Sequence, residues 1–173
     1  DDVDKRALLH PGPSIIPAAL ACAAEHNISG EALLDAIVRG YEATIRLGRA
    51  VGPGHYALWH NTGTCGAIGA AAACASLMEL DTEQTAHALA LAISQSAGLW
   101  QTRHEPESMG KQLHTAVAAR AGFDAARLAA AGVRRVKVTA RPGGLGLAGC
   151  ITHHNSAMQH PISLIGVPTD IGA

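Results

Sequence analysis

Apolar residues recur at helical spacing along most of the chain. The clearest case runs from Gly30 to about Ala50, where a large apolar side chain returns every three or four positions, the period of an amphipathic helix. The VGPG run at 51–54 predicts the end of this helix, because glycine and proline interrupt helices. Asp81 and Gln84 form a variant of the capping box, which marks another helix start. By these criteria we expect further helices over residues 14–26, 64–80, 82–98 and 109–131.

Two stretches depart from the helical pattern. Residues 99–110 are polar and interrupted by proline, so we expect a loop, and long loops inside helical domains often carry function. From 133 to 138 valines alternate with polar residues, which is the period of a strand, and the glycine- and proline-rich remainder has no assignable structure. We therefore predict a mainly α, multi-helix domain over residues 1–132 and a short strand-like, irregular segment over residues 133–173.

The stretch from Trp59 to Ala73, WHNTGTCGAIGAAAA, consists almost entirely of small residues after His60. Gly63, Gly66 and Gly69 recur at every third position, although a glycine inside a helix costs about 1 kcal/mol relative to alanine. Something must therefore approach this helix closely. Close packing of neighbouring helices and room for a substrate beside His60 are the two explanations, and both place the stretch in the middle of the domain.

Composition and charge narrow the possible partners. The 173 residues suffice for one domain, and 48% of them are hydrophobic but only 3% aromatic. A core of alanine and glycine buries little area per residue, so we expect a homodimer to add to it. The net charge of −1 and the pI near 6.9 disfavour binding to nucleic acid or to an anionic membrane. No apolar run is long enough to span a membrane and the acidic start is unlike a signal peptide, so we expect a soluble, cytoplasmic protein.

Cysteines and histidines show no spacing typical of a metal site. Cys22, Cys65, Cys74 and Cys150 lie far apart, and we expect reduced, buried side chains rather than disulfides or a zinc site. The histidines near the C-terminus could bind a metal only adventitiously. Motifs of nucleotide-binding proteins and hydrolases, such as GxGxxG, GxxxxGK[ST] and GxSxG, are absent from the sequence.

Ionisable side chains stand beside two predicted helix starts. His60 precedes the glycine-rich helix, and Lys111 with His114 opens the last one, where a separation of three residues puts both on one face. A helix N-terminus offers unpaired N–H groups and the positive end of the helix dipole, which favour a carboxylate or a phosphate. His10 lies in a loop that leads into a third helix start. A hydrogen-bonded or surface histidine and a solvated lysine are the alternatives.

Five stretches occur in a recognisable order: DD followed by HPG, GYEATIRLGRAVGP, WHNTGTCGAIGAAAACASLMELD, ALALAISQSAGL and SMGKQLHTAVAARAGFDAARLAAAG. In order and spacing they resemble the helical domain of the MmgE/PrpD family, chiefly from about Gly40 to Gly132. That family includes 2-methylcitrate dehydratase, cis-aconitate decarboxylase and iminodisuccinate epimerase. The resemblance implies a homodimer, a small di- or tricarboxylate substrate and no metal or organic cofactor.

By this resemblance, His60 matches the histidine before the family's glycine-rich helix, Lys111 its active-site lysine and His10 the histidine of its HPG loop. Asp2, or alternatively Asp1, falls near the family's acidic residue. We therefore expect His60, Lys111 and His10 to be catalytic. The expected substrate-binding residues are Asp2, Thr62, Arg103 and His114.

The resemblance and the residue types together suggest a mechanism. Neutral His60 would remove or return a proton beside a substrate carboxylate, and Lys111 would stabilise the enolate-like charge. His10 would orient the substrate or protonate a leaving hydroxyl. We expect a hydro-lyase resembling 2-methylcitrate dehydratase, an enzyme of propionate catabolism. Cis-aconitate decarboxylase or iminodisuccinate epimerase activity is the alternative within the family, and a non-catalytic helical module that packs against a partner is the alternative outside it.

The resemblance is also incomplete. Family members are two-domain chains of several hundred residues, whereas this sequence lacks the helices that normally precede DD. Of the family's α+β lid domain, only RRVKVTA resembles the start. We therefore expect a partial helical domain, with the catalytic groups of the lid missing or unplaceable.

Overall fold

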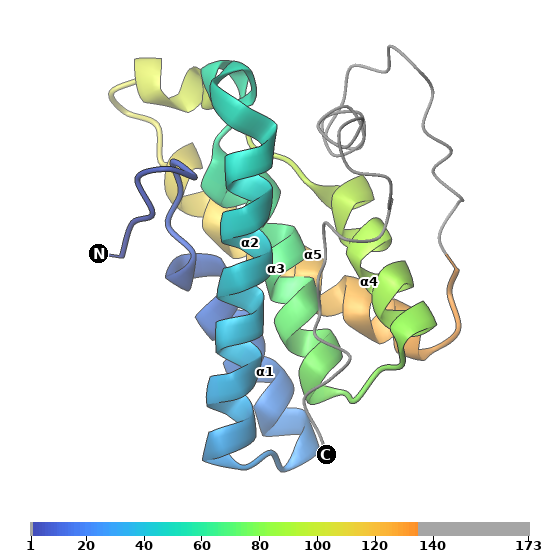
Figure 1. Ribbon diagram of the computed structural model, residues 1–173. Helices are drawn as coiled ribbons and strands as arrows, with labels where there is room; N and C mark the ends of the chain where they lie inside the picture. The colour runs from blue at the N-terminus through green and yellow to red at the C-terminus, as the bar shows by residue number, and fades with distance from the viewer. Residues whose placement is uncertain (1, 135–173) are drawn as a thin grey trace.

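The computed structural model describes residues 2–134, which form a bundle of helices (Figure 1). Its elements are α1 (Gly12–His26), α2 (Gly30–Leu58), α3 (Asn61–Leu77), α4 (Thr82–Gln95), the 3-10 helix η1 (Trp100–His104) and α5 (Gly110–Ala130). The predicted mainly α fold is confirmed. Within these residues β pairing is limited to two isolated bridges, Asp4 with Leu9 and Trp59 with Leu99. The irregular segment expected beyond residue 134, including most of the strand-like run, lies outside the described residues.

Helix α3 is the centre of the bundle and packs against α1, α2, α4 and α5 (Figure 1). Its glycines sit where neighbouring backbones touch it. A Cβ on Gly69 would lie 2.8 Å from the carbonyl oxygen of Gly40 on α2, and a Cβ on Gly40 would lie 2.8 Å from that of Gly69. On the other side, a Cβ on Gly122 of α5 would lie 2.5 Å from the carbonyl oxygen of Ala67. Close helix packing therefore accounts for these small residues.

The VGPG run interrupts the helical backbone at the predicted place, but α2 continues beyond it as a second helical segment. Gly52 adopts φ 68° and ψ −173°, which breaks the helical path, and helical backbone then resumes as far as Leu58. Pro53 follows the break at a position where a first helical turn tolerates proline, because its missing N–H would be unpaired there in any case. The result is a bend and not a stop, and the second segment carries His55 and Tyr56 toward the end of the bundle where α3 begins.

Other helix ends agree with the sequence to within a few residues. The capping box at the start of α4 is confirmed, because Gln84 N donates to Asp81 Oδ1 at 2.8 Å and Asp81 N donates to Gln84 Oε1 at 3.2 Å. Gly132 follows the end of α5 with φ 88°, a conformation that glycine adopts without strain. Helix α3 starts three residues earlier than predicted, directly after His60.

The predicted loop at 99–110 is partly wrong, because it contains η1 at Trp100–His104. Among the cysteines that the structure describes, Cys22, Cys65 and Cys74 are free and buried, as predicted. None of the helices in this part of the chain has the length and apolarity needed to cross a bilayer.

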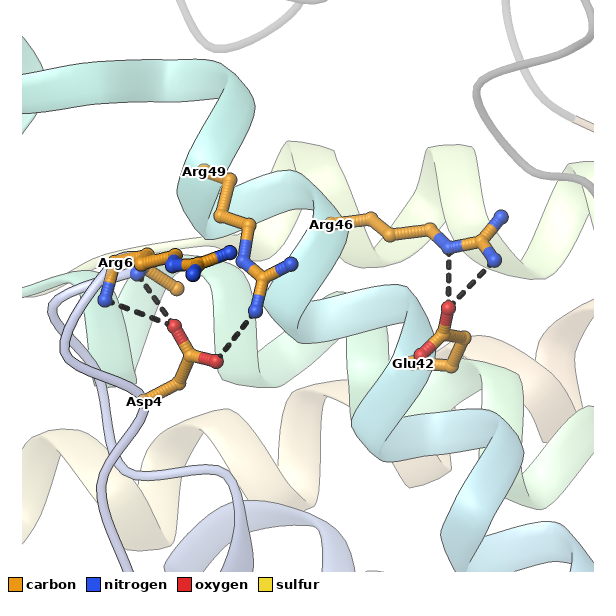
Figure 2. A network of polar contacts seen from close by, with 6 residues as sticks. Asp4, Arg6, Glu42, Arg46 and Arg49 are labelled. Carbon is orange, nitrogen blue, oxygen red and sulfur yellow. Dashed lines mark hydrogen bonds and ion pairs between the residues drawn. The ribbon is translucent and has the colours of Figure 1, made fainter.

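The N-terminal loop is tied to α2 by Asp4. This carboxylate accepts hydrogen bonds from the backbone N–H groups of Arg6 and Ala7, at 3.0 and 2.7 Å, and pairs with Arg49 at 2.7 Å (Figure 2). The hydrogen bond from Arg49 is the main reason why the pKa of Asp4 lies below its usual value. The loop so fixed ends at His10, at the N-terminus of α1.

Candidate active site

Trp100, the first residue of η1, lies at the centre of the candidate site. Its indole is buried and stacks almost parallel on the imidazole of His60, with ring centroids 4.5 Å apart and planes 9° apart. Tyr56, from the second segment of α2, meets the same indole edge-on at 5.5 Å. Stacking of this kind fixes ring orientation and keeps water away from both faces in contact. Trp100 therefore holds His60 in one orientation.

Two cationic side chains approach the same indole. The Arg103 guanidinium carbon lies 5.8 Å and the Lys111 Nζ 6.0 Å from the ring centroid of Trp100. Both distances fall within the range of cation–π attraction, about 6 Å. The structure thus brings three of the predicted residues, His60, Arg103 and Lys111, around one aromatic ring. Arg103 also donates from Nε to His104 Nε2 at 3.2 Å.

His60 and His114 face each other through their Nδ1 atoms, 3.2 Å apart. They belong to the N-terminal ends of α3 and α5 and are 54 residues apart in sequence. The turn at Gly98 makes this approach possible. Gly98 has φ 130°, and a Cβ there would lie 3.2 Å from Nδ1 of His114. Its carbonyl oxygen accepts a hydrogen bond from His60 N at 2.9 Å.

Burial favours the neutral form of both imidazoles. The pKa of His60 is lowered to about 4, first by burial and then by electrostatic interactions with His114, Lys111 and His10, which disfavour a second positive charge at this place. Burial also lowers the pKa of His114. A buried neutral imidazole surrounded by cations can accept a proton from a bound anion, because the negative charge of that anion offsets the electrostatic cost.

The loop that carries His10 joins the start of α3. His10 N donates to the hydroxyl of Thr62 at 3.1 Å, and His10 Nδ1 lies 2.5 Å from the carbonyl oxygen of Asp2. A carbonyl oxygen only accepts, so Nδ1 of His10 carries a proton and donates it to this hydrogen bond, which leaves Nε2 as the nitrogen that is not held by the loop. Asn61 fixes the same loop by donating from Nδ2 to Ala7 O at 2.9 Å.

The carboxylate of Asp2 is used within the fold. It accepts hydrogen bonds from Gly12 N at the start of α1 and from the hydroxyl of Tyr41, both at 2.9 Å. Burial and this hydrogen bond raise the pKa of Tyr41 to about 12, so the phenol stays protonated and donates. Asp2 therefore organises the His10 loop through both its carboxylate and its carbonyl oxygen.

Three helix N-termini meet at this end of the bundle. Contacts between His10 and Thr62 join the starts of α1 and α3, and the pair of His60 and His114 joins the starts of α3 and α5. Their positive dipole ends add to the charge of Lys111. Helix N-termini and a lysine together favour negative charge at this end of the bundle.

A hollow in the described part of the chain lies away from these histidines. A cavity of about 290 Å³ opens between α2, α3 and α4, with Arg39, Glu79 and Thr85 on its walls and no histidine or lysine. We place the candidate site at the histidine cluster, because proton transfer requires titratable groups within reach of each other. Among residues 2–134, no three metal-binding side chains lie close enough to hold an ion.

Sequence reasoning missed the residues that build the inner wall of the site. Trp100 was included in a polar loop, although a single large aromatic residue in such a stretch was a signal of burial. Tyr56 and His55 follow the VGPG run, where the sequence predicted the end of a helix, and neither was expected at the site, whereas His55 Nε2 lies 2.9 Å from the hydroxyl of Thr64. The role of Gly98 had no signal beyond its helix-ending position.

The fold and the candidate site define a class of protein: a helical domain that gathers histidines and cationic side chains at converging helix ends. Residues 1–156 match the family model of the MmgE/PrpD N-terminal domain, and the chain belongs to the MmgE/PrpD family. The cis-aconitate decarboxylase-like protein oryM of Aspergillus oryzae is 32% identical over 146 residues, which cover 79% of this chain. The chain's match spans 30% of that relative's length.

Proposed function

We propose that the intact protein, meaning the full gene product that contains these 173 residues, is a lyase of the MmgE/PrpD type acting on a small di- or tricarboxylate. The supporting observation is the contact between buried His60 and partly buried His114, with Lys111 and Arg103 near the same indole. Family membership supports the same class of function, since the family includes dehydratases and decarboxylases. The proposed chemistry uses no metal and no organic cofactor.

In the proposed dehydration, His60 takes the proton from the carbon next to a substrate carboxylate. Lys111 pairs with that carboxylate and stabilises the enolate-like charge as it develops. The electron pair then forms the carbon–carbon double bond, and the hydroxyl on the neighbouring carbon leaves as water after receiving a proton. A protonated His10 would supply that proton. Arg103, Thr62 and Asp2 complete the proposed substrate site, Asp2 by holding the loop of His10.

A 2-methylcitrate dehydratase-like reaction in propionate catabolism is the first candidate. The second is decarboxylation of cis-aconitate, which is favoured by the name of the Aspergillus oryzae relative. In that case the electron pair at the same carbon arises from loss of carbon dioxide, and a histidine returns a proton to it.

The test is an activity screen of the intact protein with 2-methylcitrate, citrate and cis-aconitate, measuring the change in double-bond absorbance and the release of carbon dioxide. The proposal expects turnover of at least one of them and its loss in His60→Ala. A folded protein that binds and converts none of them would instead be the non-catalytic helical module.

We further propose that the protein is a cytoplasmic homodimer. The free state of Cys22, Cys65 and Cys74 fits a reducing compartment. Leu34 and Val38, one turn apart on α2, are 66% and 65% exposed, and a second copy would remove such side chains from water. Sedimentation of the intact protein at several concentrations tests the dimer, and a monomer at every concentration would exclude it.

A further inference from the structure

The pair of His60 and His114 contains an unusual contact, because both rings present the same nitrogen to each other. A hydrogen bond between two imidazole nitrogens requires one proton and one lone pair. Two protons between the Nδ1 atoms would repel each other, and two lone pairs at 3.2 Å would gain nothing. One proton is therefore shared by the pair, and its position decides which ring can act as a base at Nε2.

The two histidines differ in their access to water. His60 is 2% exposed and is covered by the indole of Trp100. His114 is only partly buried and lies in the first turns of α5, where the neighbouring Leu113 is 61% exposed. The bond between the Nδ1 atoms thus connects a ring shielded from water to a ring that meets it.

We propose that His114 is the proton-relay partner of His60, and that it passes to solvent the proton that His60 takes from the substrate. This inference rests on the proposed lyase function. When Nε2 of His60 binds the substrate proton, the bond between its Nδ1 and hydrogen breaks and that proton moves to Nδ1 of His114. The Nε2 proton of His114 then passes to water. One proton leaves the substrate, one reaches solvent, and both rings end neutral.

The surroundings favour transfer over storage of the proton. Burial is the main cause that lowers the pKa of His60, and electrostatic interactions with His114, Lys111 and His10 add to it, so an imidazolium at His60 is unfavourable. Passing the Nδ1 proton onward avoids that charge. The backbone at Gly63 and at Gly98 also packs closely against His114 and limits its movement. A Cβ on Gly63 would lie 3.2 Å from His114 Cβ, and a Cβ on Gly98 would lie 3.2 Å from the His114 ring.

The first experiment uses His114→Ala in the intact protein. We expect kcat to fall about 100-fold, as for the loss of a proton-transfer group, while KM changes little. Free imidazole should restore much of the lost rate, because it fits the space left by the ring. His114→Asn, which keeps a polar group but cannot pass a proton along, should lose as much. His87→Ala on α4 is the matched control and should show neither loss nor rescue.

A relay is excluded if His114→Ala and His114→Asn retain their kcat, or if the loss appears only in KM and imidazole restores nothing. A second measurement separates this inference from the proposed function. Nitrogen NMR of the histidine-labelled intact protein at neutral pH should show one protonated and one unprotonated Nδ1 within the pair. Two unprotonated Nδ1 atoms would overturn the relay even in an active enzyme. Absence of turnover in the wild type overturns the lyase function. In that case the nitrogen NMR spectrum alone decides whether His60 and His114 share a proton.

Discussion

Replacing Gly122 with alanine tests whether the bundle depends on direct backbone contact between α3 and α5. The added Cβ would lie 2.5 Å from the carbonyl oxygen of Ala67, 2.5 Å from Ala70 Cβ and 2.6 Å from Ala71 N. Two of these three atoms are backbone, so the contact is relieved only if the helices move apart. Overpacking of a close-packed core costs about 1–3 kcal/mol, and a clash with backbone belongs at the upper end of that range.

Alanine also recovers about 1 kcal/mol of helix propensity relative to glycine. We therefore expect Gly122→Ala to lower the free energy of unfolding by about 2 kcal/mol, which corresponds to a fall in Tm of about 4–8 °C for a chain of this size. Thermal and urea unfolding followed by circular dichroism measures both quantities. Equal stability of Gly122→Ala and the wild type would refute the claim of backbone contact.

Gly54→Ala is the matched control for this experiment. A Cβ on Gly54 meets no atom within 4 Å, and the residue lies in helical backbone of α2. Gly54→Ala should therefore leave the free energy of unfolding unchanged or raise it by up to about 1 kcal/mol. A loss at Gly54 similar to that at Gly122 would show that the effect does not come from the crossing of α3 and α5.

Further predictions concern the site and its pH dependence. Lys111→Ala should reduce kcat/KM of the intact protein at least about 100-fold in a steady-state assay, since the positive charge proposed to face the developing enolate is lost, and wild-type turnover would exclude its role. The acid limb of the wild-type profile of kcat/KM against pH should fall near pH 4, the lowered pKa of His60, and not near its ordinary 6.5. Trp100→Ala should raise the pKa of His60 toward 6.5 in an NMR titration, because burial is the main cause of its depression, and an unchanged pKa would contradict that cause. Asp4→Asn should lower the free energy of unfolding at pH 7, because the ion pair with Arg49 is lost. The difference in unfolding free energy between this variant and the wild type should shrink as the pH falls below about 3.8 and through the lowered pKa of Asp4 in the folded state, because protonated Asp4 no longer pairs with Arg49.

The sequence predicted those features that depend on neighbours along the chain. Helix positions followed from apolar spacing, and the capping box at Asp81 followed from two residues three apart. The central place of α3 also followed, because glycines in a helix need a close partner to offset their cost. In contrast, the bend at Gly52 was taken for an end, since VGPG permits both and only packing of the second segment against the site decides between them.

The arrangement of the candidate site depended on contacts that local patterns do not encode. His60 and His114 were each noted beside a helix start, but their facing Nδ1 atoms result from the crossing of α3 and α5 and the turn at Gly98. Trp100 was missed because a polar stretch concealed a buried indole. Nothing in the sequence indicated that the carboxylate of Asp2, predicted to bind substrate, accepts hydrogen bonds from Gly12 and Tyr41 within the fold, and its contact with substrate stays a prediction.

The central claim is that the ends of α1, α3 and α5 form one site for a small polycarboxylate. Titration of citrate into the intact protein, followed by NMR signals of the His60 ring and the Trp100 indole, tests it most directly. The account predicts that both signals shift together and saturate with one dissociation constant, and that Lys111→Ala weakens binding at least about tenfold, as expected for the loss of a charged hydrogen bond. Signals that stay unchanged, or equal binding by Lys111→Ala, would contradict it.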